Sequence, residues 1–429
     1  MKALATLCAP LFLISGLASP GFAQPAYDLL LKGGHVIDPK NNISAIRDVA
    51  IAGGKVAAIA ADIPASAARK TVDVHGLYVT PGLVDIHAHV FTGAGTGHVL
   101  GGGDESEFPD GFTFRTGVTT VVDAGSSGYR NFEQFKTLVI DRAKTRVLAF
   151  LNIVGYGMRG EDTFEQDLND MDAAKAAQTC QRFKAIIVGI KVAHYNGPEW
   201  TPVEHGVEAG TIAKIPVMVD FGTFRPERPF QELVLKKLRA GDIYTHTFLG
   251  RVPMLDDHGR VLPYLFEAKK RGVIFDVGHG QASLLFRLAA PALQQGFLPD
   301  SISTDLHSGS MNAGMKDMLN VMSKFLNMGM PLDQVILRST WNPAREIHRE
   351  ELGNLSAGAT ADIAVLGIEK GEFGFVDSYG ARLAGSQRLR CELTLRAGRV
   401  VYDLDGLTRE DWRKLGKYGP QTGSWDASR

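Results

Sequence analysis

The sequence predicts an α/β protein: a (β/α)8 TIM-like barrel with a small β-sandwich domain built from both chain ends. Three observations predict this fold. In the middle of the chain, short apolar runs alternate with helical patterns, as expected of parallel strands joined by helices. Toward both ends, short strands follow one another with glycine turns between them. Polar residues end the apolar runs, where a barrel carries its active site.

The composition is ordinary for a globular enzyme and excludes several other classes of protein. Of 429 residues, 45% are hydrophobic and 22% are charged, and the formal net charge is −1. The sequence therefore lacks the basic field that would attract nucleic acid or an anionic membrane. We expect a small-molecule substrate as the partner, and the oligomeric state stays open, a homo-oligomer included.

The first 23 residues have the pattern of a secretory signal peptide. Lys2 supplies a positive start, an apolar run covers residues 3–16, and cleavage is expected after the small residue Ala23. The run is too short to span a bilayer, so we expect no stable membrane anchor. We expect an exported protein, periplasmic or secreted, whose remaining cysteines, Cys180 and Cys391, are small buried residues.

Both chain ends are expected to contribute to the β domain. Leu29–Asp38 reads as a strand, a Gly-Gly turn and another strand, and Asp48–Ile59 repeats this scheme. Near the other end, strands with a glycine turn lie at Ala361–Leu366 and Cys391–Tyr402. We therefore assign residues 24–79 and 351–410 to one β domain, and residues 411–429 to a C-terminal tail.

The barrel is assigned to residues 80–350. Its expected strands are the apolar runs 83–89, 119–123, 147–153, 185–192, 215–221, 243–248, 273–277 and 301–306. Helical patterns lie between most of them, for example at 229–238 and 262–271. Alternation of this kind predicts a closed barrel whose active site lies at the C-terminal ends of the strands.

The stretch Val79–Val90 is the most informative one in the chain. A Pro-Gly pair precedes a short apolar run that contains His87 and His89. Alternate residues of a strand share a face, so both imidazoles point the same way and suit a borderline metal such as zinc. The alternative, two ordinary histidines on a polar face, fits poorly because their neighbours are apolar and unpartnered buried imidazoles are costly.

Polar residues at the ends of later strands complete a candidate site: Lys191, Asp220, His246, His279 and Asp305, after strands four to eight. Lys191 is unusual, because burial of a lone ammonium is costly and lowers its pKa. A neutral lysine amine can take up carbon dioxide and become a carbamate, whose two oxygens can bridge two metals. The alternative for this lysine is an ammonium that reaches a carboxylate in a loop.

These motifs resemble the amidohydrolase superfamily over essentially the whole mature chain. The likeness rests on Pro-Gly-Leu-Val-Asp-x-His-x-His at residues 81–89, on the strand-four lysine, on His246 between two threonines, and on Asp305 in Ser303–His307. The segments 340–344 and 353–363 resemble the return to that family's β domain. Val122–Gly128 and Ser303–Leu306 look most like the deacetylase branch, whose relatives include dihydroorotases.

The resemblance implies a site for two divalent metal ions, with zinc the expected metal. His87, His89 and Asp305 would hold the first ion and His246 the second, and a carbamylated Lys191 would bridge them. A hydroxide shared by the two ions would attack the scissile carbonyl. Asp305 would act as general acid and base, taking the hydroxide proton and returning it to the leaving nitrogen.

One position departs from the family pattern. Members of this type usually carry a histidine at the end of strand five, where this chain has Asp220. A carboxylate is an acceptable zinc ligand, so we expect Asp220 to replace the imidazole. Two alternatives stay open: the second site is weak or empty, or His194 serves it. Strict strand alternation points His194 to the face opposite Lys191, unless the strand has already ended there.

Three further residues are candidates for contact with the substrate or its neighbours. His279 is expected either to bind the substrate or the tetrahedral oxyanion, or to orient Asp305. Tyr195 and Arg225 follow strands four and five, where a guanidinium would suit a substrate carboxylate. The alternative for Arg225 is an ordinary exposed arginine.

The expected function is metal-dependent hydrolysis of a carbon–nitrogen bond, namely removal of an acyl group from a small N-acylated compound or, by the same chemistry, an ester. The close alternative is a cyclic amidase resembling dihydroorotase or hydantoinase. A binding-only protein is the third reading: a degenerate barrel in which Asp220 marks the loss of catalysis. Retention of the other candidate ligands weighs against it.

Overall fold

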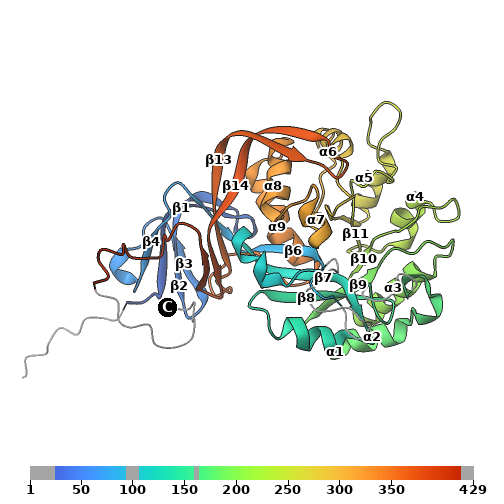
Figure 1. The fold of residues 1–429 in the computed structure, drawn as a ribbon, viewed down its shortest axis with the longest axis horizontal. Coiled ribbons are helices and arrows are strands. Elements are labelled where there is room, and N and C mark those ends of the chain that lie inside the picture. The colour runs from blue at the N-terminus through green and yellow to red at the C-terminus, as the bar shows by residue number, and fades with distance from the viewer. Residues whose placement is uncertain (1–24, 93–105, 159–163, 417–429) are drawn as a thin grey trace, which may run out of the picture.

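The computed structural model describes residues 25–92, 106–158 and 164–416 (Figure 1). The expected signal peptide at 1–23 and the last part of the expected tail lie outside these residues. No helix among those described is both long and apolar enough to cross a lipid bilayer. Two sheets organise the chain, one in its middle and one formed by its ends.

The middle of the chain forms a parallel sheet whose strands are hydrogen-bonded in sequence order from β6 to β12. They are β6 Leu83–Ala88, β7 Val118–Gly128, β8 Arg146–Asn152, β9 Ile187–Val192, β10 Val217–Val219, β11 Ile243–Tyr244 and β12 Ile274–Phe275. Figure 1 shows helices packed outside these strands. The predicted alternation of strands and helices is therefore confirmed as a parallel α/β sheet.

The last expected strand, 301–306, is not assigned as a strand, but it lies between the two edges of this sheet. Isolated parallel bridges join Asp276 to Ser301 and Ala88 to Leu306. The Val277 N–H donates to Ser301 O at 3.1 Å, and the His89 N–H donates to Leu306 O at 2.8 Å. Hydrogen bonds thus connect 301–306 with both β12 and the residue that follows β6.

The later strands are shorter than expected because the backbone leaves the extended conformation at site residues. His246 and Asp305 have φ angles of +64° and +50°, and Gly278 follows β12 with a φ of +47°. A left-handed residue ends strand pairing and redirects the next side chains. At these points the strands lose inter-strand hydrogen bonds, and the side chains of the site residues are directed toward the same place.

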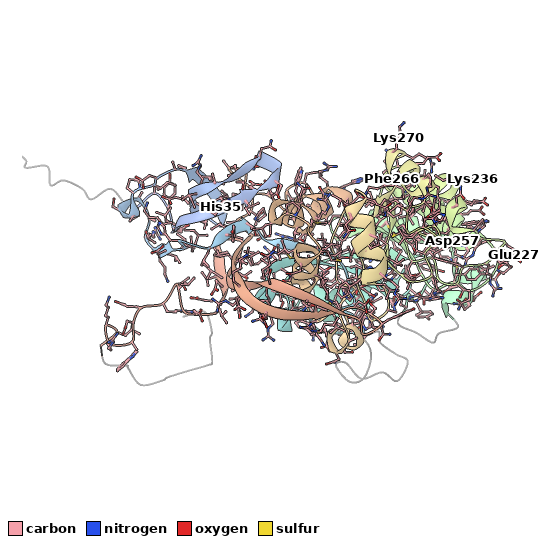
Figure 2. All side chains as sticks on the ribbon, turned by 90° about the horizontal axis from the view of Figure 1, so that it is seen from above. His35, Glu227, Lys236, Asp257, Phe266 and Lys270 are labelled. Atoms are coloured by element: carbon pink, nitrogen blue, oxygen red, sulfur yellow. The ribbon has the colours of Figure 1, made fainter. Side chains whose placement is uncertain are left out.

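Helices cover the outside of the parallel sheet. They are α1 Phe132–Phe135, α2 Ala173–Arg182, α3 Thr201–Ala213, α4 Phe230–Glu232, α5 Pro263–Lys270, α6 Phe286–Gln294, α7 Ser308–Asn312, α8 Met318–Asn327, α9 Leu332–Ser339 and α10 Trp341–Glu346. The pattern at 262–271 is confirmed as α5, whereas 229–238 forms α4 and then a π-helical turn, Leu233–Lys237. Charged side chains here, such as Lys236 and Lys270, point outward (Figure 2).

The chain ends form a second, mostly antiparallel sheet in the order β15-β14-β13-β5-β1-β2-β3, with β4 paired to β1. Its strands are β1 Leu29–Asp38, β2 Ile43–Ala52, β3 Lys55–Ala60, β4 Thr71–Asp73, β5 Tyr78–Pro81, β13 Ile363–Val376, β14 Arg382–Arg396 and β15 Arg399–Asp403. A β domain shared by both ends is therefore correct, although hydrogen bonding joins all its strands in one sheet rather than two.

The predicted turn at Gly33-Gly34 is wrong, because β1 runs through it as one strand with a bulge. Gly33 has a φ of +78°, and a Cβ at this position would lie 2.1 Å from the His75 ring. The glycine is therefore needed for a close approach inside the sheet, and not to reverse the chain.

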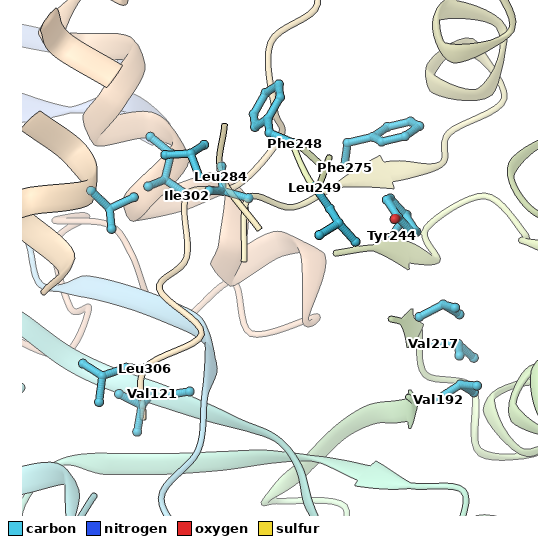
Figure 3. Packing of buried hydrophobic residues seen from close by; sticks show 14 of the residues in the cluster. Val121, Val192, Val217, Tyr244, Phe248, Leu249, Phe275, Leu284, Ile302 and Leu306 are labelled. Atoms are coloured by element: carbon cyan, nitrogen blue, oxygen red, sulfur yellow. The ribbon is translucent and has the colours of Figure 1, made fainter. Parts of the chain in front are cut away.

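Two apolar layers support the parallel sheet. One fills the space between strands and helices, where Val192, Val217 and Tyr244 follow one another on three neighbouring strands (Figure 3). The other is formed by the opposite side chains of the same strands, among them Ile86, Phe150 and Met218. Cys180 and Cys391 are buried and free, as predicted.

The β13–β14 hairpin extends from the β domain across the barrel half (Figure 1). At its tip, the Ser378 N–H donates to Leu284 O at 2.9 Å, and the Phe286 N–H donates to Asp377 Oδ2 at 3.1 Å. Along its length, β14 packs on α8. The β domain is thereby tied to the segment that follows β12.

Candidate metal centre

A cavity of about 350 Å³ opens at the C-terminal ends of the parallel strands. Its size is in the range of small-molecule sites. Histidines and carboxylates dominate its wall, which also holds one arginine and a few apolar side chains: His87, His89, Met158, Glu165, His194, Asp220, Gly222, His246, Leu249, Arg251, Gln281, Ala282, Ser283, Asp305 and His307.

His87, His89 and Asp305 converge at the centre of this cavity. Asp305 Oδ1 lies 3.3 Å from His87 Nε2 and 3.0 Å from His89 Nε2. Both histidines are buried on and just after β6, as their spacing predicted. His246 joins them, since one ligand atom each from His87, His246 and Asp305 lie within 4.8 Å of one another.

Hydrogen bonds at Nδ1 fix how two of these imidazoles face the cavity. His246 Nδ1 lies 2.7 Å from Gly278 O, which only accepts, so Nδ1 carries the proton. His87 Nδ1 lies 2.8 Å from Thr245 Oγ1, whose own proton goes to Asp276 Oδ2, so Nδ1 again donates. Both Nε2 atoms therefore present lone pairs to the cavity when the rings are neutral.

This arrangement fits a bound cation. Burial, and then the charge of Lys191, lower the pKa of His87 to about 4, so its ring is neutral at pH 7. Burial opposes ionisation of Asp305, and its pKa is held below the usual range by positive charge on the side of His87 and His89, which a bound cation would supply when the rings are neutral. An imidazole lone pair and a carboxylate oxygen 3.3 Å apart repel one another unless a cation lies between them. Nitrogen and oxygen donors of this kind suit zinc.

Asp276 supports His87 from behind, and the sequence analysis missed it. The carboxylate is fully buried and accepts from Thr245, Ser301 and Ser303 at 2.7–2.8 Å. Burial opposes its charge, but hydrogen bonds and the neighbouring His87 lower its pKa. A carboxylate inside the apolar run 273–277 was the available signal.

Lys191 is fully buried at the centre of the site. Its Nζ lies 3.2 Å from His87 Nε2 and 3.8 Å from Met218 Sδ. Within the ranges that the structure describes, it forms no ion pair, which disfavours the alternative of an ammonium reaching a loop carboxylate. Burial lowers its pKa against the pull of Asp220 and Asp305.

Asp220 and His194 meet on the other side of the cavity. Asp220 Oδ2 lies 2.9 Å from His194 Nε2 and 3.3 Å from His246 Nε2. His194 Nδ1 contacts Glu165 Oε2 at 2.9 Å. Strict strand alternation does not apply to His194, because the strand has ended and a φ of +52° turns this residue toward Asp220. Although burial opposes it, His194 and His246 hold the pKa of Asp220 well below its usual range.

Comparison with known proteins shows to which family this chain belongs. A deacetylase of Agrobacterium fabrum is 35% identical over 346 residues, which cover 78% of this chain and 81% of that protein. A deacetylase of Enterococcus faecalis is 31% identical, over 88% of this chain and 99% of that one. The pattern of the Amidohydrolase family matches residues 286–386. This chain belongs to the amidohydrolase family. It is a metal-dependent hydrolase of carbon–nitrogen bonds.

Solved structures agree with this assignment. An adenine deaminase is similar with a TM-score of 0.79 and 30% identity, over 88% of this amidohydrolase and the whole of that chain. A dihydroorotase is similar with a TM-score of 0.75 and 30% identity, over 87% of this chain and 99% of that one. Amidohydrolase relatives of this kind imply that the parallel sheet belongs to a TIM-like barrel.

The contacts of His279, Tyr195 and Arg225 with substrate remain predictions for this amidohydrolase. None of them lines the cavity. His279 Nδ1 lies 2.8 Å from Gly280 O and Nε2 lies 2.6 Å from Lys324 Nζ, which favours the alternative role beside Asp305. Tyr195 donates to Glu199, and Arg225 donates to Asn196 O.

Beside the predicted histidines and carboxylates, the cavity wall of the amidohydrolase holds residues that the sequence did not indicate. Arg251 is the informative one, five residues after His246 on the loop that follows β11. Turns in which Leu249 N–H donates to His246 O and Val252 N–H donates to Leu249 O hold this loop. Proximity to a strand-end histidine was the signal that could have identified it.

Proposed function

We propose that this amidohydrolase is a deacetylase, which removes an acyl group from a small N-acylated compound. The observation that carries the proposal is the extent of similarity. These two deacetylases align over 81% and 99% of their own lengths, whereas three dihydroorotases align by sequence over 61–63 residues, 14–15% of this chain. An enzyme that shares loops as well as strands is expected to share the substrate class, because loops set specificity in barrels.

We further propose that two divalent ions, zinc in the first instance, occupy the site. His87, His89 and Asp305 would hold one ion, and His246 with Asp220 the other, with His194 within reach of the same carboxylate. Lys191, as a carbamate formed with carbon dioxide, would bridge them. The bound ions would supply Lewis acidity and lower the pKa of coordinated water.

The chain's own residues would then handle the proton. Asp305 is ionised and lies at the cavity surface, so it can accept a proton from the attacking water and return it to the leaving nitrogen. Asp276 and Thr245 would hold the His87 ring in one tautomer throughout. Burial of the histidines limits water to the cavity side.

Arg251 supports a substrate that carries a carboxylate. Arg228 donates to backbone oxygens of Tyr195 and Thr223 at 2.9 Å, and Arg225 to that of Asn196. Arg251, by contrast, makes no hydrogen bond or ion pair within the described ranges and lies in the cavity wall. A guanidinium so placed can bind a carboxylate through two hydrogen bonds.

Three further proposals concern the fold, the domain bounds and the export of the whole chain. The segment 301–306 would close the barrel as its eighth strand, which its bridges to Asp276 and Ala88 support. The domain bounds 24–79, 80–350 and 351–410 and the tail 411–429 stand as proposed. The N-terminal pattern of Lys2, an apolar run and Ala23 supports export.

A hydrolysis screen tests the function. The protein without residues 1–23 would be prepared with zinc and bicarbonate and analysed for metal. It would then be assayed with N-acetyl amino acids, acetyl esters, dihydroorotate and hydantoins. We expect release of acetate from N-acetyl amino acids to be fastest. Faster opening of a cyclic amide would favour the second candidate, for which the likeness to a dihydroorotase structure speaks. Substoichiometric zinc in protein prepared with zinc and bicarbonate, without hydrolysis of any of these compounds, would favour a binding-only protein.

A further inference from the structure

A second lysine is fully buried close to the metal centre. Lys324 lies on α8, and its Nζ is 2.6 Å from His279 Nε2 and 2.6 Å from Gly314 O. Within the described part of the chain, no carboxylate forms an ion pair with it. A buried ammonium without a carboxylate costs stability, so its presence calls for an explanation other than packing.

Lys324 contacts His279 as a donor. Gly280 O only accepts hydrogen bonds, so His279 Nδ1, at 2.8 Å, carries the ring proton and Nε2 accepts from Nζ. Burial, followed by the charge of Lys324, lowers the pKa of His279 to about 3, which agrees with a neutral ring. The ring is therefore clamped between a helix and its own loop.

The clamped loop touches the metal centre on both sides of His279. Gly278 O accepts from His246 Nδ1 at 2.7 Å. Gly280 packs against Asp305: a Cβ on this glycine would stand 2.3 Å from Asp305 Oδ2. Both glycines have left-handed φ angles, +47° and +53°. The loop backbone is bonded to the segment before Asp305, since the Gly278 N–H donates to Ser303 Oγ and the Gly280 N–H to Thr304 O, both at 2.9 Å. Lys324 adds the hold on the His279 side chain.

Helix α8 has other attachments that would hold it in place without Lys324. The Leu389 N–H donates to Ser323 Oγ at 3.0 Å, and Asn327 exchanges hydrogen bonds with Gln387 O and the Ser386 N–H at 2.8 and 3.0 Å. These contacts dock α8 on the β13–β14 hairpin. Several contacts other than the Lys324 amine therefore dock the helix.

We propose that Lys324 is a positioning residue: through His279 it holds the loop 278–280, and with it His246 and Asp305, in the arrangement that catalysis needs. The proposal rests on the proposed hydrolase function of the site. It makes an unusual prediction, because loss of a costly buried ammonium leaves folding intact or improves it while the metal centre loosens.

The test compares Lys324→Met, Lys324→Gln and a matched control in the zinc-loaded full-length enzyme. We expect Lys324→Met to lower kcat roughly 10–100-fold and to weaken zinc binding by a similar factor, with little change in KM. Its Tm should equal or exceed that of the parent. Lys324→Gln keeps a donor for His279 and should recover part of the kcat and of the zinc affinity.

Lys269→Met is the control. This lysine, on α5, pairs with Asp300 at 2.6 Å and touches none of the cavity-lining residues. It should keep kcat and zinc affinity within about twofold, since an ion pair remote from the site adds only modest stability. The double variant Lys324→Met with His279→Gln should have a kcat and a zinc affinity no lower than those of the less active single variant. The two losses should not add, because both residues act through one chain of contacts.

Three outcomes would overturn the proposal: Lys324→Met with parental kcat and zinc affinity, an unfolded Lys324→Met together with a fully active Lys324→Ala, or additive losses in the double variant. Zinc affinity makes the result independent of the substrate. If the parent hydrolyses no acyl compound, the proposed function fails, whereas a weaker zinc affinity of Lys324→Met would still support the positioning role.

Discussion

Gly280 gives the most direct test of how tightly Asp305 is held. Its φ is +53°, and a Cβ added to it would lie 2.3 Å from Asp305 Oδ2. Cβ contacts under 3.0 Å are essentially never seen, so in Gly280→Ala the carboxylate or the loop must move by at least 0.7 Å, the difference between these distances. Asp305 is the residue proposed both to bind metal and to carry the proton.

The size of the effect follows from that displacement. A misplacement of about 1 Å at a reacting group costs on the order of 100-fold in rate, so we expect kcat of Gly280→Ala to fall roughly 30–100-fold. The left-handed backbone adds about 1–2 kcal/mol of strain for alanine. In a chain of 429 residues that strain lowers the Tm by only about 1–3 °C, which leaves the protein folded in the assay.

Gly296→Ala is the matched control, because it carries the strain without the contact. Gly296 has a φ of +83°, and among the described atoms none lies within 4 Å of its added Cβ. Acetate release and calorimetric Tm would be measured for both variants side by side. Similar losses of Tm with an unequal loss of kcat are expected, and equal kcat values would refute the reasoning.

Three further predictions concern the site itself. Lys191→Ala should lose turnover and most bound metal, because the only candidate bridge between the ions is removed; metal analysis and kcat check this. Asp305→Asn should lose turnover by about 10²-fold or more while it retains more metal than Lys191→Ala, since an amide oxygen still coordinates but accepts no proton. Arg251→Met should raise KM for N-acetyl amino acids roughly 10–100-fold and leave their neutral amides unaffected, because one charged hydrogen-bonded pair is lost.

Each of these predictions has a result that contradicts it. Full activity of Asp305→Asn would exclude the proton-transfer role, and unchanged zinc content in Lys191→Ala would exclude a bridging carbamate. An equal rise in KM for the charged and the neutral substrates would show that Arg251 shapes the cavity without reading charge. His258→Ala, at an exposed position, serves as the common control for expression and folding.

Local patterns predicted those parts of the site where the backbone is regular. His87 and His89 share a face of β6 because alternate residues of any strand do so, and Lys191 stood out as a charge in an apolar strand. The same rule could not decide the side of His194, since its φ of +52° ends the alternation. Whether a strand continues for one more residue is decided by tertiary packing, and no local pattern records it.

Long-range partners were the other part that the sequence could not supply. Lys324 lies 45 residues from His279, on a helix whose pattern would place a lysine in solvent. The turn expected at Gly33-Gly34 failed for a related reason, because the His75 ring approaches the chain there from 42 residues away. Contacts of this kind depend on how the helices and strands pack, so they cannot be predicted from residues that are neighbours in the sequence.

The position of β5 has a consequence for the order of folding. It lies between β1 and β13, so residues at the start and near the end of the chain pair on its two sides. The next residue, Gly82, donates its N–H to Asp362 O at 2.8 Å, and β6 with His87 begins directly afterwards. Pairing across such a separation in sequence is slow to form, because the loop must close before any contact rewards it. The strand that carries the first histidines pairs with β7 inside the barrel region, but the attachment of β5 to β13 needs residues 363–366, so this side of the β domain can close only after that part of the chain has been synthesised.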